Sequence, residues 1–300
     1  MADSQLLLLL FISLGSCGRI SMQENLDLKR SCGPYKRRAV YKSFGGTEIK
    51  PNEYPWIVKY FYWKGGKEHV CSGALISTRH LLTSAHCLTD YNTTEVNEQC
   101  RLRKGSRRLE PHLRNKTRMS IVIGSKCLHP ERCHERRSVE RFWIHEHWDP
   151  CTQAHDIATV ELTKDVVVSE EVAPICLPSE DLKLAILLRA AGAGLNRTLI
   201  PTKEDSVLRV VNYFSYRKED PELGLIMMRE RNVSLCTGDS GGPLFQFNQQ
   251  NRFTIVGTSI GGENDCTENH EHYDNYFVDV RLHLDWICHK TGACPISDLS

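Results

Sequence analysis

The sequence has little net charge and no apolar run long enough to span a bilayer. Across 300 residues the formal net charge at pH 7 is only +1, so no overall attraction to nucleic acid or to an anionic membrane is predicted. A single apolar run, residues 6–14, stands out, and it is too short to span a bilayer. The remaining composition, 40% hydrophobic and 25% charged, is that of a globular protein.

The apolar run lacks the positive charge that usually precedes a secretory signal, but the small residues Gly15, Ser16 and Gly18 follow it. We predict a signal peptide over residues 1–18, with an N-terminal membrane anchor as the alternative. Thirteen cysteines are too many for an ordinary cytosolic enzyme and indicate an oxidising compartment. Loss of Cys17 with the signal would leave an even number, so we expect a secreted protein with paired cysteines.

One serine lies between glycines in the stretch Cys-Thr-Gly-Asp-Ser-Gly-Gly-Pro, residues 236–243. The glycines allow a ligand to approach the backbone closely. The N–H groups of Gly238 and Ser240 can converge on one oxygen, as an acyl-transfer site needs for a developing oxyanion. A serine alone is a poor nucleophile and requires a base. The stretch therefore predicts a nucleophile if a histidine and a buried acid accompany it.

Both partners are present. Thr-Ser-Ala-His-Cys at residues 83–87 supplies His86, and Asp156 begins the alternating apolar segment 156–162. The chain order His, Asp, Ser is that of one of the known triad arrangements. Three separate motifs in one fixed order are a specific signal.

From these motifs the sequence resembles the trypsin/chymotrypsin-like serine peptidases over about residues 42–288. The resemblance is carried by residues 83–87, 156–162 and 238–243, joined by Pro-Trp at 55–56, Ala-Pro-Ile-Cys-Leu-Pro at 173–178 and Asp-Trp-Ile at 285–287. It implies an all-β fold of two antiparallel six-stranded Greek-key barrels, with a short C-terminal helix from about residue 281 to 289. The peptidase domain would cover residues 43–290 and a C-terminal tail residues 291–300.

The function implied is that of a secreted, monomeric serine endopeptidase acting on protein or peptide substrates. His86, Asp156 and Ser240 would form the triad, with Gly238 and Ser240 as the oxyanion hole. No cofactor is expected. The alternative is a catalytically weak or inactive secreted binding or regulatory protein on a peptidase scaffold.

Residues 19–42 resemble a pro-segment. In this family a cut frees an amino group that pairs with the acid before the nucleophile, which here is Asp239. The matching cut lies between Lys42 and Ser43, although the family has a large apolar residue where Ser43 stands. A cut after Arg38 and a disordered tail with no switch remain open alternatives.

The resemblance places Ser234 at the floor of the pocket that receives the substrate side chain. A neutral floor offers no partner to a buried lysine or arginine, so a preference for apolar or aromatic side chains is expected. Ser259 would support the buried acid, and Ser259 and Gly261 would pair with the substrate backbone. Asp274 and Asn275 lie near the far wall and leave the preference open.

The resemblance also implies four disulfides and leaves four cysteines unassigned. The implied pairs are Cys32–Cys176, Cys71–Cys87, Cys236–Cys266 and Cys288–Cys294, while Cys100, Cys127, Cys133 and Cys151 allow three pairings. Residues 177–235 contain no cysteine, although the family commonly has some there. The C-terminal ring closed by Cys288 and Cys294 is similar to that of nematode-type members.

An insertion is expected at about residues 97–119, because His86 and Asp156 are 70 residues apart. It is strongly basic, with Arg101, Arg103, Lys104, Arg107, Arg108, Arg114, Lys116 and Arg118. It is either a solvated loop or a site for acidic glycans, nucleic acid or another acidic partner. Nucleic acid is otherwise not expected as a partner. Candidate glycosylation sites are Asn92, Asn115, Asn196 and Asn232.

Two His-x-His pairs, His145 with His147 and His270 with His272, are candidate metal ligands. Two histidines make an incomplete zinc set, and the sequence shows no third ligand. We therefore predict no metal site.

Overall fold

The computed structural model describes residues 18–34, 46–90, 93–102, 112–127, 133, 135–194, 208–214, 216–231, 234–262 and 272–295. Several residues singled out above lie outside this part: residues 1–17 of the predicted signal, Arg38, Lys42, Ser43, Asn92, Arg103, Lys104, Arg107, Arg108, Asn196, Asn232, Cys266 and His270.

Alternating β-branched and aromatic residues of the first half form a six-stranded antiparallel sheet in the order β5-β2-β3-β4-β7-β6. Its strands are β2 (Ile57–Lys64), β3 (Lys67–Leu75), β4 (His80–Thr83), β5 (Met119–Ile123), β6 (Val139–Ile144) and β7 (Ala158–Leu162). Ile121 and Arg137 exchange two backbone hydrogen bonds, which joins β5 to the segment that leads into β6. The sheet therefore closes on itself, as the resemblance implies.

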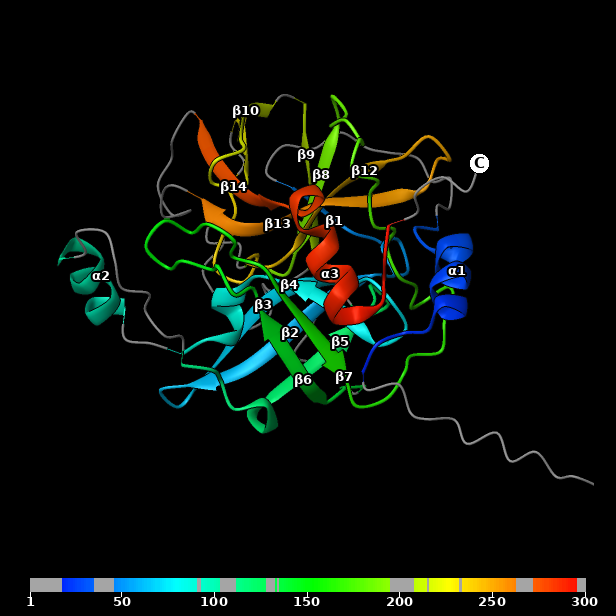
Figure 1. The fold of residues 1–300 in the computed structure, drawn as a ribbon, viewed down its shortest axis with the longest axis horizontal. Coiled ribbons are helices and arrows are strands. Elements are labelled where there is room, and N and C mark those ends of the chain that lie inside the picture. Colours follow the sequence, from blue (N-terminus) through cyan, green and yellow to red (C-terminus); the bar gives the residue numbers. More distant parts are fainter. Residues whose placement is uncertain are drawn as a thin grey trace, which may run out of the picture.

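The second half forms an eight-stranded antiparallel sheet in the order β1-β9-β8-β12-β13-β14-β11-β10 (Figure 1). Its strands are β1 (Thr47–Glu48), β8 (Leu188–Gly192), β9 (Arg209–Tyr213), β10 (Tyr216–Asp220), β11 (Leu225–Glu230), β12 (Pro243–Phe247), β13 (Phe253–Gly262) and β14 (Tyr273–Asp279). The predicted all-β class with two antiparallel sheets is confirmed. The second sheet exceeds the expected six strands because β1 and β10 pair with β9 and β11 at its edges.

The two sheets share one apolar core. Aromatic rings from both halves meet in it: Trp56 contacts Phe245 edge to face, with ring centroids 5.8 Å apart, and Phe253 at a tilt, with centroids 5.1 Å apart. Trp56 is completely buried. Such contacts fix the relative position of the halves, on which any site between them depends.

Two short helical segments close the chain. The 3₁₀-helix η4 (Val280–His283) runs directly into α3 (Leu284–Thr291), which ends at Gly292 in the left-handed conformation (Figure 1). The predicted C-terminal helix is thus present over nearly the expected residues. None of the described helices is both long enough and apolar enough to cross a bilayer.

Helix α1 (Met22–Ser31) lies in the predicted pro-segment and begins with a capping box between Ser21 and Glu24. It packs against the C-terminal part of the chain, where Ile20 N donates to Thr291 O and Cys294 N to Asn25 Oδ1. Gly33 exchanges backbone hydrogen bonds with the body of the domain, donating to Pro174 O. The segment is therefore docked along the domain.

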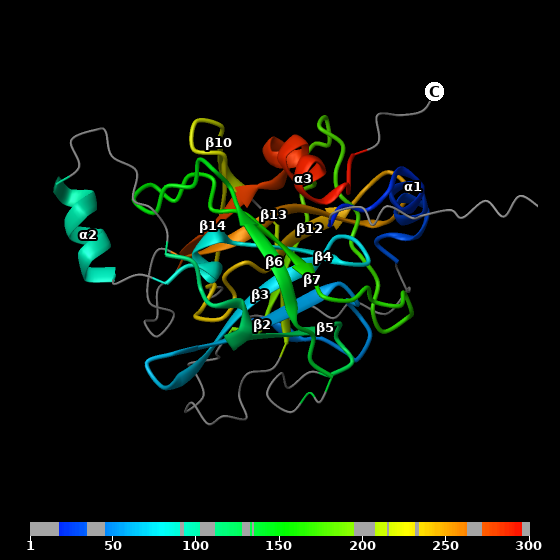
Figure 2. The same cartoon turned by 60° about the horizontal axis from the view of Figure 1, so that its bottom comes forward.

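Helix α2 (Thr93–Leu102) belongs to the predicted insertion and stands apart from both sheets in Figures 1 and 2. Its Cys100 is bonded to Cys151, in the loop between β6 and β7. This disulfide ties the insertion to the segment that leads to Asp156.

Candidate active site

His86 and Asp156 are brought together by the first sheet. His86 lies in the 3₁₀-helix η1 (Ala85–Leu88) directly after β4, and Asp156 lies just before β7, the strand that pairs with β4. Asp156 is fully buried and accepts two hydrogen bonds from His86, from the backbone N–H at 2.8 Å and from ring Nδ1 at 2.6 Å. The acid therefore fixes both the position and the tautomer of the ring, leaving Nε2 as the basic nitrogen.

The charge of Asp156 sets the basicity of His86. Burial on its own lowers the pKa of His86, but the charge of Asp156 and the hydrogen bond to it raise the pKa above the ordinary value of 6.5. Arg114 opposes this rise through its positive charge. The imidazolium that forms when His86 accepts a proton is therefore stabilised by the carboxylate beside it.

Ser240 is anchored to β3 by a backbone hydrogen bond. Ser72 N donates to Ser240 O at 2.7 Å, and Cys87 Sγ lies 3.6 Å from that same oxygen. On the other side, Ser259 O accepts hydrogen bonds from Gly241 N at 2.6 Å and from Ser84 Oγ at 2.7 Å. Gly241, next to Ser240, and Ser84, two residues before His86, thus share the acceptor Ser259 O.

Glycine is required beside Ser240 because the turn that carries Ser240, residues 238–242, approaches β3 and β4 closely. We call this turn the serine elbow. Gly241 has φ +81°, and a Cβ there would lie 2.1 Å from Thr83 Oγ1. Within the described structure Ser240 Oγ makes no hydrogen bond to His86, a bond that in free enzymes is often long and tightens on substrate binding.

The two candidate oxyanion donors are on this elbow. Gly238 has φ +105°, and neither its N–H nor that of Ser240 is engaged with another described residue. Their availability is what an oxyanion hole requires.

Ser72 is a functional candidate that the sequence did not reveal. Its buried hydroxyl donates to Gly238 O at 2.7 Å and accepts from Ala193 N at 3.0 Å, across more than a hundred residues of chain. It joins the peptide after Gly238 to β3 of the first sheet and to Ala193, which follows β8 of the second. A lone serine in a strand carries no sequence signal for such a contact.

Asp239 carries its charge without a cationic partner at hydrogen-bond distance in the described structure. Its carboxylate accepts from Gly194 N at 2.7 Å and from Cys236 N at 2.9 Å. Burial raises the pKa of Asp239 to about 6, against the lowering effect of these two hydrogen bonds. A buried carboxylate of this kind is suited to receive an ammonium group.

Around the predicted pocket floor the polar groups are neutral. Asn275 is fully buried, and its Oδ1 accepts from Leu235 N, next to Ser234, at 2.7 Å. A Cβ on Gly262 would lie 3.3 Å from Ser234 Oγ and 3.5 Å from Asn275 Oδ1, so these three residues border one space. Sequence reasoning left Asn275 open; the structure places it beside Ser234.

Asp274 has a different environment. It is 3% exposed, and both of its oxygens accept from the guanidinium of Arg229 on the neighbouring strand, at 2.5 and 2.8 Å. A bidentate pair of this kind neutralises the carboxylate and fixes its direction.

Ser259 differs from expectation. Its hydroxyl is buried and makes no hydrogen bond in the described part of the chain, so no bond runs from it to Asp156. The carbonyl of Ser259, which joins the two loops above, is the part of this residue that the structure engages. Gly261, in contrast, lies at the open end of β13 with φ +137° and free space where a Cβ would lie.

The described cysteines are paired. The structure joins Cys32 to Cys176, Cys71 to Cys87 and Cys288 to Cys294, the pairings that the resemblance implies, and adds Cys100–Cys151 and Cys127–Cys133. Cys236 is also disulfide-bonded. Cys71–Cys87 joins β3 to the residue after His86, and so holds the His86 loop against β3.

One end of the basic insertion contacts the His86 loop. Arg114 Nε donates to Cys87 O at 3.0 Å, and its guanidinium lies 3.8 Å from the centre of the Tyr62 ring. Lys116 Nζ donates to Glu140 O. These two of the eight basic residues are thus held by the domain, whereas Arg101 on α2 is exposed.

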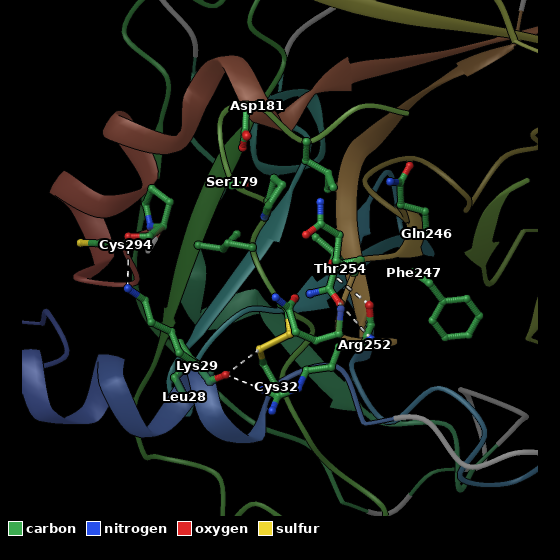
Figure 3. Close-up of a pocket in the computed structure, with 18 of the residues that line it drawn as sticks. Leu28, Lys29, Cys32, Ser179, Asp181, Gln246, Phe247, Arg252, Thr254 and Cys294 are labelled. Atoms are coloured by element: carbon green, nitrogen blue, oxygen red, sulfur yellow. Dashed lines mark hydrogen bonds between the residues drawn. A yellow bond between two sulfur atoms is a disulfide. The ribbon is translucent and has the colours of Figure 1, made fainter. Parts of the chain in front are cut away.

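A cavity of about 820 Å³ lies away from the candidate triad, between α1, the C-terminal segment and the β12–β13 hairpin (Figure 3). Lys29 and Arg252 cross it: Lys29 Nζ donates to Pro295 O at 3.1 Å, and Arg252 Nη1 donates to Lys29 O at 2.5 Å. The cavity is where the docked N-terminal segment meets the domain, and no triad residue lines it.

Comparison with known proteins places these features in one family. The model of the family described as Trypsin matches residues 43–287. Serine protease 7 of Drosophila melanogaster is 27% identical over 292 residues, covering 92% of this chain and 71% of its own. Chymotrypsin-C of Bos taurus is 25% identical over 92% of this chain and 93% of its own, and brachyurin of Leptuca pugilator is 27% identical over 84% and 99%.

Proposed function

The chain belongs to the trypsin family, and we propose that it is a secreted serine endopeptidase whose triad is His86, Asp156 and Ser240. The observation that carries the proposal is the pair of hydrogen bonds from His86 to the buried Asp156, with the loops of His86 and Ser240 joined at Ser259 O. A structural histidine does not need both a fixed tautomer and a buried countercharge beside a serine elbow.

Chemistry at this site follows from the positions of these groups. His86 Nε2 accepts the proton of Ser240 as its oxygen attacks the substrate carbonyl, and later donates that proton to the leaving amine. Asp156 stabilises the imidazolium formed between these steps. The N–H groups of Gly238 and Ser240 stabilise the negative oxygen of the tetrahedral intermediate.

We further propose that cleavage between Lys42 and Ser43 activates the enzyme. The new amino group would pair with Asp239, whose pKa is raised by burial. The segment before the cut would stay attached through Cys32–Cys176 and through its contacts with the C-terminal residues.

For the substrate we propose an apolar or aromatic side chain in the pocket bordered by Ser234 and Asn275. Asp274, the carboxylate that would favour lysine or arginine, is neutralised by Arg229. Cleavage profiling on a peptide library tests this point: dominant cutting after lysine or arginine would refute it.

The test of the activity itself is labelling of Ser240 with a fluorophosphonate. The chain cleaved after Lys42 should be labelled, and the Ser240→Ala and His86→Ala variants should not, because labelling requires the activated hydroxyl. Absence of labelling in the cleaved wild-type chain would leave the alternative, an inactive binding protein on this scaffold.

A further inference from the structure

Three histidines far apart in the sequence meet at one place outside the triad. His145 follows β6, His155 immediately precedes Asp156, and His283 ends η4. One ring nitrogen from each lies within 4.8 Å of the others. The rings of His145 and His155 stack with centroids 4.8 Å apart, and His283 meets both edge to face.

We propose that His145, His155 and His283 form a binding site for a divalent transition-metal ion of the Zn²⁺ class. Imidazole nitrogen is a preferred ligand of such ions. Three nitrogens at about 2.0–2.1 Å from a tetrahedral ion lie about 3.4 Å from one another. The observed spacing approaches that value, with His155 Nδ1 already 3.0 Å from His283 Nε2, and a water molecule would complete the tetrahedron.

The hydrogen bonds around His283 prepare it as a ligand. Its Nδ1 lies 2.8 Å from Asp279 O, and a carbonyl only accepts, so the proton is on Nδ1 and Nε2 carries a lone pair. A metal-bound histidine usually donates its second N–H to such an acceptor. The Nδ1–H of His155 points at the lone pair of His283. An ion that binds there takes the place of this proton, which His155 holds on Nε2 instead.

The site is accessible from solvent. His145 and His155 are only partly buried, so an ion can reach them from solvent.

The loop that carries the ligands is already held on both sides. Glu146 accepts from Trp286 Nε1 at 2.7 Å and pairs with Lys290 at 2.5 Å, which docks the loop on α3. Cys151 is bonded to Cys100. Two ligands therefore come from a loop of restricted motion, and the third from η4 opposite it, which favours a preformed site.

Binding is tested on the full chain without an affinity tag. After removal of metals with a chelator, calorimetric titration with Zn²⁺ should show one saturable site, and Co²⁺ should give the intense visible absorption of a tetrahedral complex. The key variant is His155→Asn, because His155 has φ +54° and asparagine tolerates this conformation. We expect its Zn²⁺ affinity to fall at least about tenfold.

The matched control is His289→Gln, an exposed histidine on α3 outside the cluster, which should bind Zn²⁺ as the wild type does. Wild-type affinity in His155→Asn, or the weak spectrum of octahedral Co²⁺, would overturn the proposal. Neither measurement depends on peptidase activity.

A consequence for activity rests on the proposed function. Because His155 adjoins Asp156, drawing its ring toward the ion shifts the acid, and a misplacement of about 1 Å is enough to cost on the order of 10²-fold in rate. Saturating Zn²⁺ should therefore lower kcat of the cleaved enzyme reversibly, and not in His155→Asn. Unchanged kcat at full occupancy would overturn this coupling, while the binding measurements alone decide the metal site.

Discussion

His86 and Asp156, at the ends of strands of the first sheet, are already joined by hydrogen bonds, whereas Asp239, in the loop before β12 of the second sheet, is a buried carboxylate with no cation at hydrogen-bond distance in the described structure. In the first sheet the buried acid has two hydrogen bonds to His86, and Cys71–Cys87 clamps the loop. In the second sheet the carboxylate is held by two backbone N–H groups and has a raised pKa. Under the proposed function, the difference implies that activation would act on the Ser240 side of the site and would leave the His86–Asp156 side unchanged.

The largest expected effect comes from removing the charge of Asp156 beside His86. Asp156→Asn keeps the volume but removes the charge and lets the wrong tautomer of His86 form, so kcat of the cleaved enzyme should fall by about 10⁴-fold with little change in KM. Steady-state kinetics on a peptide substrate measures this. Asp285→Asn, at an exposed position of α3, is the control. A loss below about tenfold would show that Asp156 does not orient the base.

The two halves of the site also differ in how much of each could be predicted from the sequence. The motifs around His86, Asp156 and Ser240 are local, and their resemblance to a known family predicted the all-β fold with two antiparallel barrels. Ser72, whose contacts lie more than a hundred residues away, left no pattern. The pairing of Asp274 with Arg229 depends on the register of β11 and β14, which spacing alone does not determine.

The histidine cluster is a second example of what spacing hides. In the sequence, His145 and His147 form a pair with no third ligand. The third histidine of the cluster was missed because His283 is 128 residues from His155, and only the fold brings them together. The second sheet has more strands than the six that the resemblance implies, because the two-residue strand β1 and the edge strand β10 are added at its two ends.

A second prediction, with a smaller expected effect, concerns Asp239. The pKa of Asp239 is about 6 in the folded, uncleaved chain and 3.8 for the free side chain. The folded state thus holds the proton more tightly, so this contribution to stability is full below pH 3.8 and is lost as pH rises through 6. The free energy of unfolding should fall by at most about 3 kcal/mol over this range on account of Asp239.

Asp239→Asn should remove that part of the pH dependence, and Asp285→Asn should not. Denaturant unfolding of the uncleaved chain at pH 4 and pH 7 gives the comparison for each variant. If wild type and Asp239→Asn keep parallel profiles, the carboxylate is not destabilised in the uncleaved chain, and the contrast between the two sheets fails.

A third prediction is the acid limb of the activity profile. His86 acts as a base only when neutral, and its pKa is raised above 6.5 chiefly because Asp156 outweighs the effect of burial. Activity is therefore present above this pKa and falls as pH is lowered through it, with kcat/KM dropping about tenfold for each further pH unit. Profiles of kcat/KM between pH 5 and 9 measure the limb. A midpoint below 6.5 in the free enzyme would contradict the assignment.

The smallest expected effect sharpens the comparison at Arg114, a residue through which the insertion contacts the His86 loop. Arg114 lowers the pKa of His86 by its charge and donates to Cys87 O. Arg114→Gln should move the acid limb to higher pH by less than about one unit, with kcat on the alkaline plateau unchanged. Arg114→Lys, which keeps the charge, should restore the limb, and Arg101→Gln on the exposed face of α2 should not move it. A shift toward lower pH would mean that the contact with Cys87, rather than the charge, is what reaches His86, and that the insertion stiffens the His86 loop mechanically.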